Sequence, residues 1–186
     1  MTPVSLDIVG AAEMEALGRR VGSLLRRGDL VILSGELGAG KTTLTRGIGE
    51  GMGVRGPITS PTFVLSRVHP PEAPGKDVPL VHVDAYRLGS PRELDDLDLD
   101  FDGAAVVVEW GDGMLDDVAD SWLRIRIERA RSMREGRSDE AKRPDEDARQ
   151  VTLEGHGAEW GPLRLASLAQ GPRDERSAQR PEEAEA

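Results

Sequence analysis

The 186-residue chain contains no cysteine. This absence excludes a disulfide framework, a thiolate zinc site and a cysteine nucleophile. Aromatic residues make up only 3% of the chain, so aliphatic side chains must fill most of its core. No apolar run approaches the roughly 18 residues that a membrane span needs. Residues 1–10 also lack the basic start and apolar core of a secretory signal. We therefore expect a cytoplasmic protein without a membrane partner.

Positive charge is scarce as well. The chain has 24 Lys and Arg residues against 34 Asp and Glu residues, a formal net charge of −10. Proteins that grip nucleic acid directly normally carry a basic patch, because phosphate neutralisation supplies most of the affinity. No such patch is evident outside the Arg-rich residues 124–137. We expect no DNA partner, and we expect any RNA to be reached through partner proteins.

One stretch is highly specific: residues 35–42, GELGAGKT, fit the P-loop pattern G-x-x-x-x-G-K-[ST] without a mismatch. Glycines let the backbone wrap closely round a phosphate with its N–H groups inward. Lys41 brings a charge to the β- and γ-phosphates, and the Thr42 hydroxyl can bind Mg²⁺. The motif and the next residue predict a nucleoside triphosphate site built from Gly35, Glu36, Leu37, Gly38, Ala39, Gly40, Lys41, Thr42 and Thr43.

The surroundings of the motif predict the fold class. A buried strand at residues 31–33 precedes it and a helix at residues 42–50 follows it, as a P-loop requires. We expect an α/β, P-loop NTPase-like three-layer domain with a mostly parallel central sheet, covering residues 1–169. Apolar spacing and turn residues predict further elements. We expect helices at 11–27 and 163–169, and a short acidic helix that starts near Ser90 and has apolar positions up to Phe101. We also expect a turn that runs into a strand within 58–66, and strands at 80–83, 104–108, 122–128 and 149–153. Residues 131–148 are expected to form a flexible charged loop, and residues 170–186 a disordered tail.

Hydrolysis needs more than the P-loop: a carboxylate that helps hold Mg²⁺ and a group that orients water. Asp84 follows the apolar strand LVHV, and Glu109 follows AAVVV. Ligands of open parallel sheets lie beyond the carboxyl ends of the strands, so both acids are candidates. Spacing alone does not say which of them holds the metal. We therefore expect Lys41, Asp84 and Glu109 to be catalytic.

Three other residues stand out in the sequence. Thr62 lies in the region after the P-loop helix where many P-loop proteins place a nucleotide-sensing residue. Trp110 directly follows a candidate metal ligand and precedes a glycine, which is typical of an aromatic side chain that contacts a ligand or partner. His82 is a lone strand histidine, and we expect it to be structural.

Together these motifs resemble the TsaE (YjeE) family, the ATPase component of bacterial tRNA threonylcarbamoyladenosine biosynthesis. The resemblance rests on four segments in the same order and with similar spacing. They are the P-loop with Thr43, the Ser60-Pro61-Thr62-Phe63 segment, the segment HVDAYRL at residues 82–88, and Val108-Glu109-Trp110. It extends over roughly residues 5–160.

The resemblance implies a small P-loop domain that binds ATP with Mg²⁺ and docks on the TsaB–TsaD heterodimer, with tRNA reached only through these partners. By the family pattern, Thr42 and Glu109 match the Mg²⁺ ligands, and Asp84 matches an acid needed for hydrolysis. Three residues, Ser60, Pro61 and Thr62, match a switch-like loop, and Trp110 matches a functional aromatic beside it. The 131–148 loop is longer than the usual connection in the family, so two arginines, Arg137 and Arg149, are both candidates for the basic residue expected there.

Other classes remain open. A small-molecule or nucleotide kinase would use Asp84 as the base on an acceptor hydroxyl and residues 124–137 as a lid, although no acceptor-binding insertion is evident. A regulatory GTPase is less favoured, because its guanine-selecting Asn-Lys-x-Asp element needs asparagine and the chain has none. A nucleotide-binding subunit without turnover is the third alternative.

Overall fold

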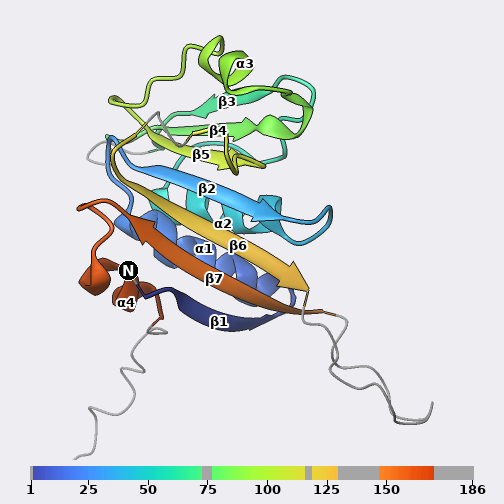
Figure 1. Ribbon diagram of the computed structural model, residues 1–186, viewed down its shortest axis with the longest axis vertical. Helices are drawn as coiled ribbons and strands as arrows, with labels where there is room; N and C mark the ends of the chain where they lie inside the picture. Colours follow the sequence, from blue (N-terminus) through green and yellow to red (C-terminus); the bar gives the residue numbers. More distant parts are fainter. Residues whose placement is uncertain (1, 73–76, 116–118, 130–146, 170–186) are drawn as a thin grey trace, which may run out of the picture.

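The computed structural model describes residues 2–72, 77–115, 119–129 and 147–169. Its centre is a seven-stranded sheet in the order β1-β7-β6-β2-β5-β4-β3 (Figure 1). The strands are β1 (Val4–Val9), β2 (Leu30–Gly35), β3 (Ser66–His69), β4 (Leu80–Asp84), β5 (Ala105–Glu109), β6 (Trp122–Arg129) and β7 (Ala148–His156). The helices are α1 (Gly10–Leu24), α2 (Lys41–Met52), α3 (Pro91–Asp95), α4 (Pro162–Ala169) and the 3₁₀ turn η1 (Ala85–Arg87).

The sheet is mixed rather than mostly parallel, which corrects our expectation. Neighbours are parallel between β6 and β2, β2 and β5, and β5 and β4. They are antiparallel between β1 and β7, β7 and β6, and β3 and β4. The parallel strands β2, β4 and β5 are buried along nearly their whole length, as the apolar runs predicted.

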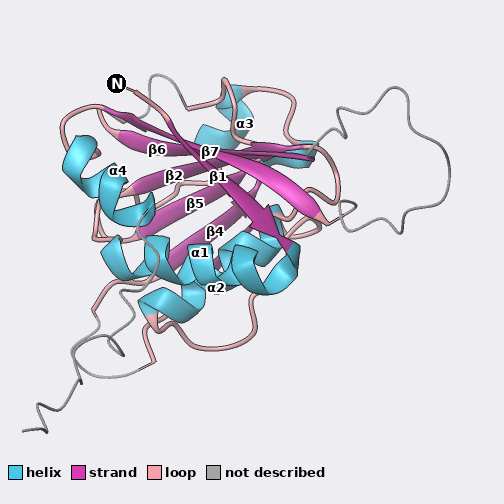
Figure 2. Cartoon of the chain, turned by 90° about the horizontal axis from the view of Figure 1, so that it is seen from below, coloured by secondary structure: helices cyan, strands magenta, loops and turns pink. Residues whose placement is uncertain are grey.

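The expected three layers are only partly present. Helices α1 and α2 pack side by side against one face (Figure 2), and their core includes Leu17, Leu44, Leu33 and Ile125. The other face of β2, β4 and β5 is covered by η1, α3 and nearby turns, through residues such as Leu88 and Leu94. The same face of β6 and β7 carries polar or charged side chains, from Arg124, Arg126, Glu128, Gln150, Thr152 and Glu154. A full second layer is therefore absent from the described residues.

Several strand predictions were wrong in their limits. The turn expected within 58–66 extends to Leu65, and the strand after it, β3, begins only at Ser66. The short helix after Ser90 ends at Asp95 and does not reach Phe101. Strand β1 was not predicted, because its pairing partner β7 lies about 140 residues further along the chain. Ala148 belongs to β7 rather than to a loop. Most of the predicted 131–148 loop, and all of the 170–186 tail, lie outside the described residues.

Helices α1 and α2 approach each other closely because glycines face the contact. A Cβ at Gly18 would collide with the carbonyl oxygen of Leu44, and one at Gly47 with the carbonyl oxygen of Glu15. These obstacles are backbone atoms, which cannot rotate away. The α1–α2 contact sets the position of α2 and therefore of Lys41 and Thr42 in its first turn. None of the helices within the described ranges is long and apolar enough to cross a membrane.

We predict that Gly47→Ala destabilises the protein. Alanine favours an isolated helix by about 1 kcal/mol, but an overpacked contact costs about 1–3 kcal/mol. Because backbone meets the new methyl group, we expect a net loss of about 1–2 kcal/mol in the free energy of unfolding, measured in urea. The control is Gly161→Ala, whose Cβ would meet its nearest atom, the Ala158 carbonyl oxygen, at an ordinary 3.7 Å. Equal stability of Gly47→Ala and wild type would contradict this account of the packing.

Candidate functional site

The glycine-rich loop, residues 35–42, joins the end of β2 to the first turn of α2, as the sequence predicted. Gly40 precedes the helix with φ of 116°, a left-handed conformation that a side chain disfavours. Gly35 has φ of 145°, and a Cβ there would collide with the carbonyl oxygen of Ile127 on β6. The backbone therefore requires glycine at both positions. The helix behind the loop turns its unpaired N–H groups toward it, an arrangement that suits an anion.

Lys41 lies folded back over this loop and is only 5% exposed. Its Nζ donates hydrogen bonds to the carbonyl oxygens of Gly35 at 2.7 Å and Glu36 at 3.0 Å. Nζ also lies 3.5 Å from the centroid of the Trp110 ring, a cation–π contact. Burial lowers the pKa of Lys41, while the charges of Glu109 and Asp84 act to raise it. The ammonium group is thus held at the loop by carbonyls and an aromatic face.

Glu109 ends β5 directly beside the glycine-rich loop. Its side chain is buried, and Oε2 accepts a hydrogen bond from the Thr42 hydroxyl at 3.1 Å. Oε1 lies 2.9 Å from Nε2 of His82 and 3.5 Å from the Thr45 hydroxyl. A hydroxyl and a carboxylate oxygen therefore converge at the start of α2.

This pair of oxygens fits Mg²⁺. Mg²⁺ in phosphate-binding sites is typically held by one or two protein oxygens, with phosphate and water completing the octahedron. The described residues contain no group of three or more His, Cys, Asp or Glu side chains that could cage a metal by themselves. Thr42 and Glu109 can hold such an ion together with a phosphate ligand.

Asp84 ends β4 and is held by three hydrogen bonds. Oδ2 accepts from the hydroxyls of Ser60 and Thr62, each at 2.6 Å, and Oδ1 accepts from the backbone N–H of Tyr86 at 3.0 Å. Burial favours the neutral acid, but these hydrogen bonds outweigh it and lower the pKa of Asp84. Pro61 is next to both hydroxyl residues, and its carbonyl oxygen accepts from the N–H groups of Val64 and Leu65. This turn aims both hydroxyls at Asp84.

Trp110 has φ of 64°, which is unusual for a residue with a bulky side chain. Its backbone N–H donates to the carbonyl oxygen of Leu33 at 2.9 Å, so the strained turn is tied to β2. The ring lies over Lys41 and 5.0 Å from the ring of Tyr86. Tyr86, whose side chain is 58% exposed, was not singled out from the sequence, although its place two residues after Asp84 is a signal that could have found it.

The structure thus brings together most of the residues that the sequence singled out. Lys41, Thr42, Asp84, Glu109 and Trp110 meet at one edge of the sheet. Thr43 follows Thr42 in the first turn of α2, and Leu37 is 77% exposed at the tip of the loop. Of the two basic candidates, Arg149 donates from Nε to the carbonyl oxygen of Ala39 at 3.3 Å, whereas Arg137 lies outside the described residues.

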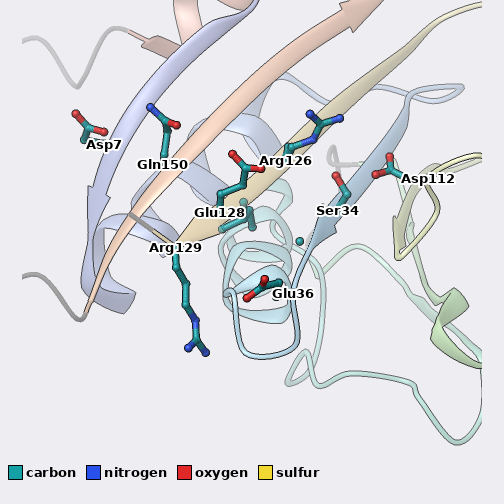
Figure 3. Close-up of a pocket in the computed structure, with 10 residues that line it drawn as sticks. Asp7, Ser34, Glu36, Asp112, Arg126, Glu128, Arg129 and Gln150 are labelled. Atoms are coloured by element: carbon teal, nitrogen blue, oxygen red, sulfur yellow. The ribbon is translucent and has the colours of Figure 1, made fainter. Parts of the chain in front are cut away.

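A polar groove of about 850 Å³ opens beside the glycine-rich loop (Figure 3). It runs over the uncovered face of β6 and β7, and its lining includes Glu36, Ser34, Arg126, Glu128 and Gln150. Its lining contains carboxylates and guanidinium groups, so it carries both signs of charge. Lys41, Asp84 and Glu109 do not line this groove, and all three are buried.

Comparison with known proteins gives consistent matches. The family model described as "Threonylcarbamoyl adenosine biosynthesis protein TsaE" matches residues 8–138. A Streptomyces coelicolor protein named tRNA threonylcarbamoyladenosine biosynthesis protein TsaE is 53% identical over 159 residues, covering 84% of this chain and 99% of that protein. A Bacillus subtilis protein of the same name is 36% identical over 123 residues, covering 66% and 75%. The crystal structure of Bacillus subtilis YdiB superposes with a TM-score of 0.64 at 27% identity, covering 90% and 95%.

We predict that the double variant Ser60→Ala/Thr62→Val raises the pKa of Asp84 toward its ordinary value of 3.8. Both substitutions remove donors that favour the carboxylate. A depressed carboxyl pKa adds stability that is fully present above the unfolded-state pKa and is lost as the pH falls through the folded-state value. The stability that the variant loses should therefore be largest above about pH 4 and shrink below it.

A carboxyl-carbon NMR titration of Asp84 and urea unfolding at several pH values would measure both effects. Ser5→Ala removes an exposed hydroxyl from β1 and serves as the control. An unchanged Asp84 pKa in the double variant would show that the two hydroxyls do not set it.

We also predict that Trp110 reports a phosphate ligand at the loop. A ligand that draws Nζ of Lys41 toward itself takes the cation off the ring, so tryptophan emission should change when ATP and Mg²⁺ are added. Trp110→Phe should abolish the change, because Trp122 and Trp160 remain in that variant but lie outside this site. An equal change in Trp110→Phe would place the responding tryptophan elsewhere.

Proposed function

Because this chain belongs to the TsaE family of tRNA threonylcarbamoyladenosine biosynthesis proteins, we propose that it is the P-loop ATPase of that pathway. In this proposal it binds ATP with Mg²⁺, hydrolyses it to ADP and phosphate, and acts on the TsaB–TsaD complex. That complex modifies the adenosine next to the anticodon of tRNA. The family itself was predicted from the four sequence segments, and the matches confirm it.

The observation that carries the ATPase proposal is the meeting of four groups at one sheet edge: the Lys41 ammonium, the Thr42 hydroxyl and the carboxylates of Asp84 and Glu109. Phosphoryl transfer needs positioning and electrostatic stabilisation more than covalent chemistry by the protein. A cation for the phosphates, a hydroxyl–carboxylate pair for a metal and a second carboxylate beside them supply those needs.

Each residue then has a distinct role. Lys41 exchanges the carbonyl oxygens of Gly35 and Glu36 for phosphate oxygens and offsets their charge. Thr42 and Glu109 hold Mg²⁺, which when bound neutralises charge on the β- and γ-phosphates. Asp84 orients the attacking water, and the hydroxyls of Ser60 and Thr62 keep its carboxylate ionised and fixed.

The surface charge supports indirect contact with tRNA. The chain carries a formal net charge of −10, whereas a direct grip on tRNA needs a basic surface to neutralise phosphates. We therefore propose that the partner proteins bind the tRNA and that this subunit contributes nucleotide turnover.

Reconstitution tests the proposal: this protein, TsaB, TsaD, tRNA, ATP and the threonylcarbamoyl donor, with modified tRNA and released phosphate measured over many turnovers. Wild-type protein should sustain modification. Lys41→Ala and Glu109→Gln should lower phosphate release by about 100-fold or more, since the first removes the cation that faces the phosphates and the second removes the carboxylate assigned to hold Mg²⁺.

Asp112→Asn is the matched control, because this carboxylate is half exposed and pairs with Arg124 at 3.3 Å rather than with Thr42. Undiminished modification without this protein would contradict the role in the pathway. Phosphate delivered to a metabolite instead of water would contradict the ATPase assignment.

A further inference from the structure

His82 is buried next to the proposed metal-holding carboxylate. It lies on β4, is 0% exposed, and faces Val107 of β5 in the strand register, so Glu109 is its diagonal neighbour on the same face. Nε2 of His82 lies 2.9 Å from Oε1 of Glu109. The sequence suggested only a structural histidine, because the strand pattern does not show which neighbour a side chain reaches.

The two oxygens of Glu109 are engaged on opposite sides. Oε1 faces His82 and, at 3.5 Å, the Thr45 hydroxyl, which itself donates to the carbonyl oxygen of Lys41. Oε2 faces Thr42 at 3.1 Å. The terminal torsion of a glutamate is soft and does not by itself fix the plane of the carboxylate. The contacts at Oε1 therefore fix the orientation of the carboxylate, so that Oε2 faces Thr42.

The His82 ring makes its hydrogen bond to Glu109. An ionised carboxylate only accepts hydrogen bonds, so Nε2 must carry the hydrogen and donate it. Nδ1 of His82 is buried and has no hydrogen-bond partner among the described residues. Burying a polar ring is unfavourable unless its hydrogen bonds are made. The hydrogen bond to Glu109 is therefore the one interaction that this buried imidazole makes with the described residues and that an aliphatic side chain at position 82 could not make.

We propose that His82 is a positioning residue for Glu109: its Nε2–H holds Oε1 so that Oε2 and the Thr42 hydroxyl form a ready-made pair of Mg²⁺ ligands. The inference rests on the proposed function, because it assigns Glu109 to Mg²⁺. His82 itself touches neither metal nor nucleotide. Groups that orient metal ligands in this way typically contribute 10–100-fold to metal affinity or activity.

His69 provides a matched control, because it is a second buried histidine close to His82. It lies on β3, is 3% exposed, and its ring centroid is 6.5 Å from that of His82. Within the described residues no hydrogen bond joins His69 to Glu109, and the Nε2 atom of His69 is buried without a hydrogen-bond partner. A substitution of His69 therefore disturbs the same packing without removing the bond to Glu109.

The experiment compares His82→Gln, His82→Asn and His69→Gln in the full chain. Glutamine can place an amide N–H where Nε2 lies, whereas the shorter asparagine reaches only the position of Nδ1. Binding of a fluorescently labelled ADP is measured during a Mg²⁺ titration and again in EDTA, with thermal unfolding as the check on folding. This readout needs no ATP hydrolysis.

We expect His82→Asn to raise the half-saturating Mg²⁺ concentration by about 10–100-fold while leaving nucleotide affinity in EDTA unchanged. His82→Gln and His69→Gln should stay close to wild type. Equal Mg²⁺ dependence in His82→Asn and wild type would overturn the inference, as would an equal loss in His69→Gln or in His82→Gln. An absence of any Mg²⁺ effect on the wild-type chain would overturn it too.

A failure of the proposed function can be distinguished from a failure of the His82 proposal. A wild-type chain that binds nucleotide in a Mg²⁺-dependent way but neither hydrolyses ATP nor supports tRNA modification would refute the ATPase proposal and leave the His82 result readable.

Discussion

Parallel pairing of β4, β5 and β2 places the candidate site. Asp84 lies opposite Glu109, and Glu109 lies opposite Leu33, two residues before Gly35. Because side chains alternate along a strand, a slip of one residue would turn either carboxylate to the opposite face of the sheet. The buried aliphatic residues on both faces of these strands resist such a slip. The register of an apolar core thus sets the spacing of two acids and a phosphate-binding loop.

Burial of those acids imposes a second condition, since a buried carboxylate without partners is costly. Asp84 meets it with two hydroxyls and one backbone N–H, whereas Glu109 meets it with Thr42 and His82. Different partners leave the two acids with different surroundings. Asp84 is tied to a turn after α2, and Glu109 is tied to α2 itself and to β4. Identical chemistry at two strand ends can therefore support two roles.

The sequence was most informative where one short pattern determines the local structure. The strand–loop–helix unit around Lys41, the buried strands and both strand-end acids were predictable, because glycine conformation, apolar runs and strand polarity are local properties. Strand β1 was not, because it pairs with a segment far along the chain. The turn before Ser66 was predicted to pass into a strand too early, since its apolar residues Phe63 and Val64 look like strand residues but are exposed. The positive φ of Trp110 has no sequence signal, because such a conformation is imposed by tertiary contacts.

Contacts that begin at Lys41 connect the loop to Trp110 and, through Tyr86, to Asp84. A phosphate that engages Nζ must replace the two carbonyl hydrogen bonds and the face of Trp110. Charge-assisted bonds to phosphate are stronger than bonds to neutral carbonyls, so the exchange is favourable in spite of the contacts it breaks. Trp110 also contacts the ring of Tyr86, whose backbone N–H donates to Asp84. In the proposed ATPase, this aromatic pair therefore lies between the lysine assigned to the phosphates and the carboxylate assigned to orient water.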